Sequence, residues 1–285
     1  MESLIIDFYS GANMSEGCTH DCGSCSSACK SKVEDNRFKL NELSKVKKII
    51  GVVSGKGGVG KSSVTSLLAT IFRRRGYKTA VLDADLTGPS IPKAFGLKGG
   101  VEGDENVLFP AVTKTGIEVM SINLMLEDES APVLWRGPVL GGVIKQFYEQ
   151  TAWNEVDYMF VDMPPGTGDI PLTVFQSLPL DGVVVVTTPQ ELVRMVVEKV
   201  VKMASLMNIK VLALVENMSY FVCPDCGKKH RIFGEGKTEE AGKLNDIPVF
   251  TLPIDKDVAS LEDKGLIELF EGDYLDGLCD VLEKR

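Results

Sequence analysis

The chain has 285 residues, 44% of them hydrophobic, so it can bury a sizeable core in one large α/β domain with or without tails. Its formal net charge of −9 argues against a nucleic-acid partner. No apolar run approaches the roughly 18 residues that cross a bilayer, and the first residues lack the basic start and apolar stretch of a signal peptide. We therefore expect a cytoplasmic protein without membrane contact. Thiols stay reduced there, which favours the seven cysteines as metal or cluster ligands over disulfides.

The first forty-odd residues show no sustained helical or strand period, and they predict a flexible, cysteine-rich tail and linker over residues 1–46, ahead of a folded domain over 47–285. Four thiols in the tail have the spacing C-x3-C-x2-C-x3-C among small polar residues, which lets a backbone wrap around an inorganic core. An iron–sulfur cluster is favoured; Zn²⁺, with His20 as a competing ligand, and unliganded or redox-active thiols are the alternatives. The four residues are Cys18, Cys22, Cys25 and Cys29.

A glycine-rich loop follows a buried-strand pattern that ends at Ser54, and an amphipathic helix pattern follows the loop up to Arg75. The loop fits G-x-x-x-x-G-K-[ST], the phosphate-binding motif, in its strand-to-helix setting. Glycines let backbone N–H groups surround an anion, and the helix N-terminus adds its positive end. Lys61 is expected to reach the β- and γ-phosphates of ATP, and the Ser62 hydroxyl to ligate Mg²⁺. The predicted nucleotide-binding residues are Gly55, Lys56, Gly57, Gly58, Val59, Gly60, Lys61, Ser62 and Ser63.

Carboxylates come at the ends of the next two core strands. The strand 79–83 leads into Asp83-Ala-Asp85, and the strand 156–162 ends on Asp162 before a Pro/Gly loop. Ligands of open α/β sheets bind at this edge. One acid of the first pair is expected to approach the Mg²⁺ shell and the other to orient the attacking water. Asp162 is expected at the metal, with Gly166 or Gly168 donating an N–H to the γ-phosphate.

The rest of the chain alternates strands and helices, which predicts an α/β fold with a doubly wound, mostly parallel sheet. Strands are expected at 181–188, 209–216 and 248–253, helices at 138–150, 190–207 and 273–284, and a peripheral hairpin at 107–112 and 117–122. Asn217, just beyond one strand, is placed to bind adenine, and Pro253 and Asp255 to line the same base pocket. Arg136 is either a phosphate or partner contact or an ordinary loop cation.

A second cysteine group, Cys223-Pro-Asp-Cys226, forms a tight turn that supplies half of a tetrahedral thiolate site. We favour a cluster bridged between two chains of a symmetric dimer. The alternatives are completion by the N-terminal thiols, and a Zn²⁺ site that includes His230. A redox dithiol lacks its usual setting at a helix start. Cys279, alone in the last helix, is interpreted as a small buried hydrophobe.

These residues carry a family resemblance. The loop has a second lysine, Lys56, directly after its first glycine. In this it resembles the deviant Walker A loop of SIMIBI-class ATPases such as MinD, ParA and the nitrogenase iron protein. Together with segments 83–90, 135–138, 162–169, 216–219 and 223–226, the chain from about residue 47 onward resembles the Mrp/ApbC/Nbp-type iron–sulfur cluster carrier ATPases. The N-terminal cysteine spacing departs from the longer spacings of eukaryotic cytosolic members with an N-terminal cluster.

The resemblance implies a homodimer that encloses two ATP molecules, with Lys56 contacting the nucleotide of the other subunit. It implies catalytic roles for Lys56, Lys61, Asp85 and Asp162, with Asp85 positioning water, and a [4Fe-4S] cluster bridged by Cys223 and Cys226. The expected partners are cluster donors and apo iron–sulfur proteins. Rival readings are a spatial-positioning ATPase like MinD or ParA, a zinc-binding regulatory ATPase, and an ATP-driven electron donor. The acidic C-terminus and the clustered cysteines argue against the MinD or ParA reading.

Overall fold

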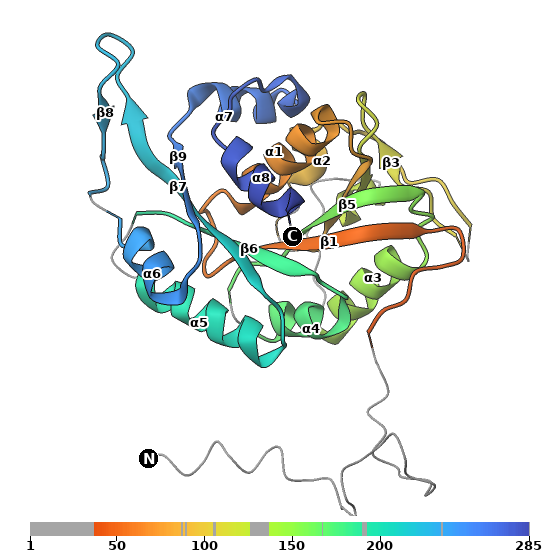
Figure 1. Ribbon diagram of the computed structural model, residues 1–285. Helices are drawn as coiled ribbons and strands as arrows, with labels where there is room; N and C mark the ends of the chain where they lie inside the picture. Colours follow the sequence, from red (N-terminus) through yellow and green to blue (C-terminus); the bar gives the residue numbers. More distant parts are fainter. Residues whose placement is uncertain are drawn as a thin grey trace, which may run out of the picture. The chain divides into compact units, whose positions relative to one another are not determined.

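The computed structural model describes residues 37–284, except 87, 89, 105–106, 126–136, 167, 190–192 and 235. This part is built on one mixed sheet with the strand order β3-β4-β2-β5-β1-β6-β7-β8, and β9 also pairs with β7 (Figure 1). All pairings within the run β4-β2-β5-β1-β6-β7-β9 are parallel, whereas β3 and β8 are antiparallel to their neighbours. The strands are β1 (Lys45–Ser54), β2 (Thr79–Asp83), β3 (Ala111–Val112), β4 (Glu118–Met120), β5 (Glu155–Asp162), β6 (Gly182–Thr187), β7 (Val211–Val222), β8 (Lys229–His230) and β9 (Val249–Pro253).

Helices cover both faces of the sheet, as a doubly wound fold requires. Side chains alternate along β1: Ile49 and Val53 face one core cluster, and Ile50 and Val52 face the other. Helices α3 to α6 lie over the first face and α1, α2, α7 and α8 over the second (Figure 1). The predicted fold class is thereby confirmed. The helices are α1 (Lys61–Arg74), α2 (Ile91–Ala94), α3 (Gly137–Glu149), α4 (Asp169–Ser177), α5 (Val193–Leu206), α6 (Thr238–Asn245), α7 (Lys256–Asp263) and α8 (Asp276–Glu283), with short 3-10 turns η1 (Ile122–Leu124) and η2 (Ile267–Leu269).

The segment just before β1 is held by hydrogen bonds to the C-terminal ends of α3 and α4. The backbone N–H of Phe38 donates to the Ser177 carbonyl at 2.7 Å, and the Asn41 amide donates to the carbonyls of Glu149 and Thr151 at 2.8 Å. The compact domain therefore begins at residue 37. The division at residues 46 and 47 stays a prediction, but the described end of the expected linker is packed onto the domain.

Two elements differ from their expected form. The 117–122 segment forms a hairpin with β3, as expected, but its strand β4 also joins the main sheet in parallel with β2. Strand β7 runs on to Val222, six residues beyond the expected end at Glu216, because its ladder with β9 resumes at Tyr220 after an irregularity and its last two residues pair with β8. Met218 lies in that irregular stretch with a positive φ of 56°. Asn217 is therefore inside a strand rather than beyond it.

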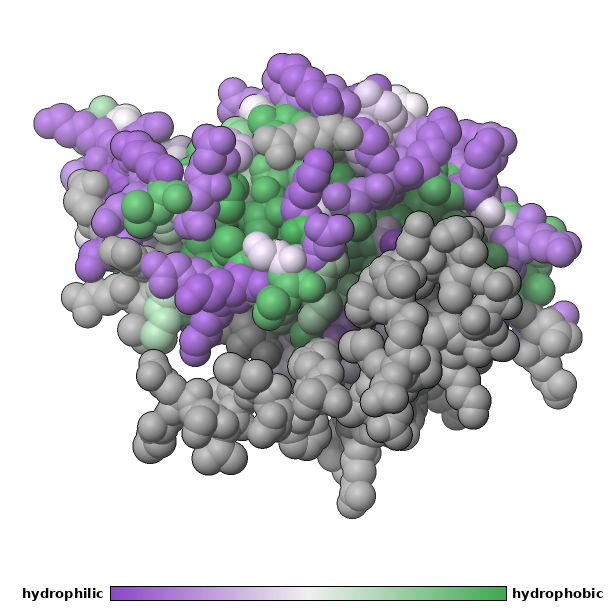
Figure 2. Space-filling model, turned by 60° about the horizontal axis from the view of Figure 1, so that its bottom comes forward, coloured by the Kyte–Doolittle hydropathy of each residue, from purple (hydrophilic) through white to green (hydrophobic). Residues whose placement is uncertain are grey.

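The face covered by α3 to α6 is turned forward in Figure 2, where apolar residues show between polar ones. Within the part of the chain that the structure describes, no helix is both long and apolar enough to cross a membrane.

Candidate nucleotide and metal sites

The phosphate-binding loop joins β1 to α1 and depends on glycines at particular points. Gly58 and Gly60 adopt φ angles of +77° and +80°, a backbone conformation that residues with a Cβ rarely adopt. Gly55 lies under α5, and a Cβ there would come 1.8 Å from a methyl of Val196. Helix α1 begins at Lys61, directly after Gly60. The backbone amides of the loop and of the first helical turn thus gather at one point, which suits an anion.

Lys61 is held at this point by two carboxylates. Its ammonium lies 2.8 Å from Asp162 Oδ2 and 3.3 Å from Asp85 Oδ2, and only 6% of the side chain is exposed. Desolvation opposes the charge of Lys61 most strongly, yet the acids Asp162 and Asp85 hold its pKa above the usual value. The structure therefore brings three of the four predicted catalytic residues together.

Asp162 is the centre of this network. Its Oδ2 also accepts a hydrogen bond from the Ser62 hydroxyl at 2.6 Å, and its Oδ1 accepts one from Thr65 at 2.9 Å. A carboxylate beside a Ser hydroxyl at the end of a strand is the donor set that P-loop proteins offer to Mg²⁺. The chemistry of these residues fits that ion.

The acids of the Asp-x-Asp pair have different surroundings. Asp83 is fully buried, accepts from the Ser121 hydroxyl at 2.9 Å and accepts from the backbone N–H of Asp85 at 3.2 Å. Burial, followed by the nearby charge of Asp162, raises the pKa of Asp83 well above its ordinary value. Asp85 instead faces Lys61. Of the two, Asp85 has the position expected for a group that acts on substrate.

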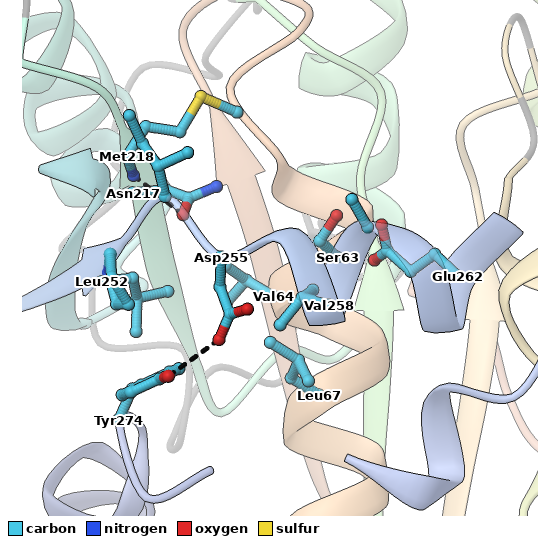
Figure 3. A pocket seen from close by; sticks show the side chains of 13 residues that line it. Ser63, Val64, Leu67, Asn217, Met218, Leu252, Asp255, Val258, Glu262 and Tyr274 are labelled. Carbon is cyan, nitrogen blue, oxygen red and sulfur yellow. Dashed lines mark hydrogen bonds between the residues drawn. The ribbon is translucent and has the colours of Figure 1, made fainter. Parts of the chain in front are cut away.

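A cavity of about 200 Å³ opens beside the first turn of α1 (Figure 3). All the predicted base-pocket residues, together with Ser63 of the loop, line it. The Asn217 amide also donates to the Val59 carbonyl at 3.0 Å, which ties this wall of the cavity to the phosphate loop. The lining residues are Ser63, Val64, Leu67, Asn217, Met218, Leu252, Pro253, Ile254, Asp255, Val258, Ala259, Glu262 and Tyr274.

Sequence reasoning missed the far wall of this cavity. Glu262 of α7 lies across the cavity from Asn217, and Tyr274, which precedes α8, lies below Asn217 in the view, where its hydroxyl donates to Asp255 at 2.7 Å (Figure 3). Burial raises the pKa of Glu262. Asp255 also caps α7 by accepting from the Asp257 N–H. Asp255 itself was predicted, and the segment Asp255-Lys-Asp257 also indicates its capping role. No local sequence pattern marks Tyr274.

The Pro/Gly loop after β5 passes close to the phosphate loop. The backbone N–H of Gly166 donates to the Ser54 carbonyl at 2.8 Å, and that of Met163 donates to the Val52 carbonyl at 3.0 Å. Gly166 has a φ of +93°, and Gly168 directly precedes α4.

Two other predicted residues lie elsewhere. Lys56 is exposed on the phosphate loop. Arg136 falls outside the described residues.

The second cysteine group sits at the tip of the β7–β8 hairpin, which projects from the sheet edge (Figure 1). Cys223 and Gly227 close the turn, because the Cys223 N–H donates to the Lys228 carbonyl and the Gly227 N–H to the Cys223 carbonyl, both at 2.9 Å. The ligand atoms of Cys223, Cys226 and His230 lie within 4.8 Å of one another. The N–H groups of Cys226 and Asp225 lower the pKa of Cys223. The N-terminal group, Cys18, Cys22, Cys25 and Cys29, lies outside the described residues.

The fold and the phosphate loop define a P-loop NTPase. Solved structures agree: the nucleotide-binding protein of Archaeoglobus fulgidus, in complex with ADP and with cobalt, is 45% identical, with a TM-score of 0.74 over 81% of this chain and 91% of that one. The cell division ATPase MinD of Pyrococcus furiosus shares the fold at 19% identity, with a TM-score of 0.58 over 83% of this chain and 98% of that one.

Residues 45–274 match the family model of ParA-type NUBPL iron-transfer P-loop NTPases, and the chain belongs to this family. An iron–sulfur cluster carrier protein of Clostridium perfringens is 45% identical over 86% of this chain and 87% of its own length. A homologue of the cytosolic Fe–S cluster assembly factor NUBP2 from Culex quinquefasciatus is 43% identical over 78% of this chain and 90% of its own length. The predicted family is therefore confirmed.

Proposed function

We propose that the protein is a Mg-ATP-hydrolysing carrier that holds a [4Fe-4S] cluster between two copies of the chain and passes it to apo iron–sulfur proteins. One observation carries the proposal: strand β7 bears both the base-pocket residues Asn217 and Met218 and, directly after its last residue Val222, the cysteine turn. Family membership and the relatives described as iron–sulfur cluster carriers support the same assignment.

The nucleotide step uses charge and position. Lys61 is placed to neutralise the β- and γ-phosphates, and Asp85 to orient the attacking water. Mg²⁺, held through Ser62 and Asp162, would withdraw charge from the phosphate oxygens. Lys56, exposed on the loop, is assigned to the nucleotide of the second subunit.

The cluster step needs two chains. A [4Fe-4S] cluster takes four thiolates, and each hairpin offers Cys223 and Cys226. A twofold dimer that brings the two hairpins together completes the ligand set. Transfer then proceeds by thiolate exchange: acceptor thiolates replace the hairpin thiolates one by one, and the oxidation state of the cluster does not change.

Anaerobic reconstitution with ferrous iron and sulfide tests the proposal, with Cys279→Ala as the control because Cys279 is a buried core residue. The full chain with Cys223→Ser and Cys226→Ser is expected to lose about one [4Fe-4S] cluster per dimer and to stop delivering clusters to an apo-protein. Lys61→Met is expected to keep the cluster but to lose the effect of ATP on transfer. Full cluster uptake and delivery by the double cysteine variant would refute the assignment.

A further inference from the structure

The hairpin brings a third metal-ligating side chain to the cysteine turn. His230 ends β8 and pairs with Phe221 of β7, so the hairpin register fixes it beside the turn. Its ring nitrogen and the sulfurs of Cys223 and Cys226 lie within 4.8 Å of one another, and in the described part of the chain this group has three members. Two thiolates bound to one Zn²⁺ at about 2.3 Å lie roughly 3.7 Å apart in tetrahedral geometry. Small side-chain rotations therefore suffice to bring all three atoms onto one ion.

The turn also supplies hydrogen bonds to the sulfur that would bind metal. The backbone N–H groups of Asp225 and Cys226 donate to the Cys223 sulfur, and Gly227 completes the turn with a φ of +68°. Donors of this kind orient a ligand and stabilise its charge before metal binds. The arrangement is thus built within a single chain, whereas four hairpin thiolates for a cluster require a second chain.

We propose that Cys223, Cys226 and His230 of one chain bind a single divalent transition-metal ion, with a water molecule in the fourth position. Two thiolates and an imidazole favour borderline-soft ions such as Zn²⁺, Co²⁺ or Fe²⁺ over Mg²⁺ and Ca²⁺. Three protein ligands and one open position keep the ion exchangeable. The role of His230 is the new element, because the cluster proposed above uses the sulfurs alone.

The ion and the cluster compete for the same two sulfurs. A chain that holds one ion cannot give its thiolates to a bridged cluster until the ion leaves. Bound Zn²⁺ is therefore expected to slow cluster loading in the wild-type chain. This expectation rests on the proposed function, but the single-ion site does not.

Cobalt binding tests the site directly, because Co²⁺ reports its ligands by absorption. The protein tested is the full chain with Ser in place of the four N-terminal cysteines, because those thiols could also bind cobalt. The replaced residues are Cys18, Cys22, Cys25 and Cys29. We expect one Co²⁺ per chain, with intense tetrahedral ligand-field bands and thiolate charge-transfer bands. Loss of even an indirect partner of a metal ligand weakens binding about 10–100-fold, so His230→Gln should raise the dissociation constant at least about tenfold and shift the bands.

Two further variants sharpen the result. Lys229→Gln, a neighbour whose ammonium lies over the Tyr220 ring, should leave the spectrum and affinity unchanged. His230→Cys should restore affinity and increase the thiolate charge-transfer intensity per cobalt.

Equal affinity and spectrum for wild type and His230→Gln would overturn the proposal, as would half a cobalt per chain with four thiolate ligands. A cobalt site that loses affinity in His230→Gln, in a chain that takes up no [4Fe-4S] cluster, would instead refute the proposed function and keep this inference.

Discussion

The ammonium of Lys61 lies 2.8 Å from Asp162 Oδ2, so the phosphate-loop lysine and the acid that ends β5 form a buried ion pair. The Ser62 hydroxyl donates to the same oxygen. In the proposed function, Mg²⁺ would take the Asp162 and Ser62 oxygens and the phosphates would take the lysine, so nucleotide binding would replace these interactions. In this structure the charge of Lys61 is balanced by Asp162 and Asp85.

Asp162→Asn is expected to lower Mg-dependent ATP hydrolysis about 10²–10³-fold, the typical loss when a preorganised electrostatic group is removed from an active site. The amide keeps the shape but loses the charge that Mg²⁺ needs. Steady-state phosphate release at saturating ATP checks this, with Glu155→Gln at the exposed start of β5 as the matched control. Hydrolysis within tenfold of the control would contradict the role of Asp162.

Asp83→Asn is expected to stabilise the protein at neutral pH. Burial and the charge of Asp162 raise the folded-state pKa of Asp83, so its contribution to stability is present below its unfolded pKa and is lost as pH rises through the folded value. The amide mimics the neutral acid and can still accept from the Asp85 N–H. Urea unfolding between pH 4 and pH 8 should show that the variant has a higher free energy of unfolding than wild type, by a difference that grows with pH. A difference that shrinks as pH rises would contradict this prediction.

Gly60→Ala is expected to reduce both stability and ADP affinity. Its φ of +80° costs a residue with a Cβ roughly 1–2 kcal/mol, and the new methyl would lie 2.2 Å from the Asn217 amide nitrogen. Gly142→Ala is the control, since it is exposed in α3, meets no atom within 4 Å and should gain about 0.5–1 kcal/mol. Urea unfolding and ADP titration measure both effects. Equal stability of the two variants would rule out this account of Gly60.

The thiols are expected to react with iodoacetamide at very different rates. Burial raises the pKa of Cys279 to about 12, which keeps it a neutral thiol at pH 8. Neighbouring N–H groups lower the pKa of Cys223, so more of it is thiolate at that pH. In metal-free protein, peptide mass spectrometry should find Cys223 labelled within minutes and Cys279 labelled only after unfolding in urea. Comparable rates in the native protein would disprove the difference in environment.

Thr238→Val is expected to destabilise the protein by about 1–3 kcal/mol, the cost of leaving a buried polar group without its partner. The Thr238 hydroxyl donates to Glu216, which is 2% exposed and also accepts from Ser219 at 2.6 Å. Ser205→Ala, exposed on α5, should stay within about 0.5 kcal/mol of wild type. Chemical denaturation compares the two. A Thr238→Val change no larger than that of Ser205→Ala would show that Glu216 does not depend on this contact.

The sequence predicts well those features that local patterns determine. Strands β2 and β5 end on Asp83 and Asp162 as expected, and α1 begins at Lys61, because apolar runs, glycines and the loop motif lie side by side in the chain. The doubly wound fold follows from the same alternation. The roles of individual site residues stay predictions, although the structure places Asn217, Pro253 and Asp255 around one cavity.

The missed features depend on contacts far apart in sequence. The pattern Asp-x-Asp does not say which acid is buried; packing against Ser121 decides it. Tyr274 reaches the cavity beside α1 only because α8 packs against the face that carries α1. The length of β7 depends on β9, since Tyr220 resumes its parallel pairing with Pro253.

Strand β7 has a mechanical consequence for the whole molecule. At roughly 3.3 Å per residue, Cys223 lies at most about 20 Å along the backbone from Asn217, and the irregular stretch around Met218 falls between them. The stretch around Met218, where the pairing with β9 is interrupted, adjoins the cavity beside α1. A tilt of the chain at that stretch would displace the hairpin tip, so the wall of the cavity at Asn217 and the cysteine sulfurs are joined by a single length of polypeptide.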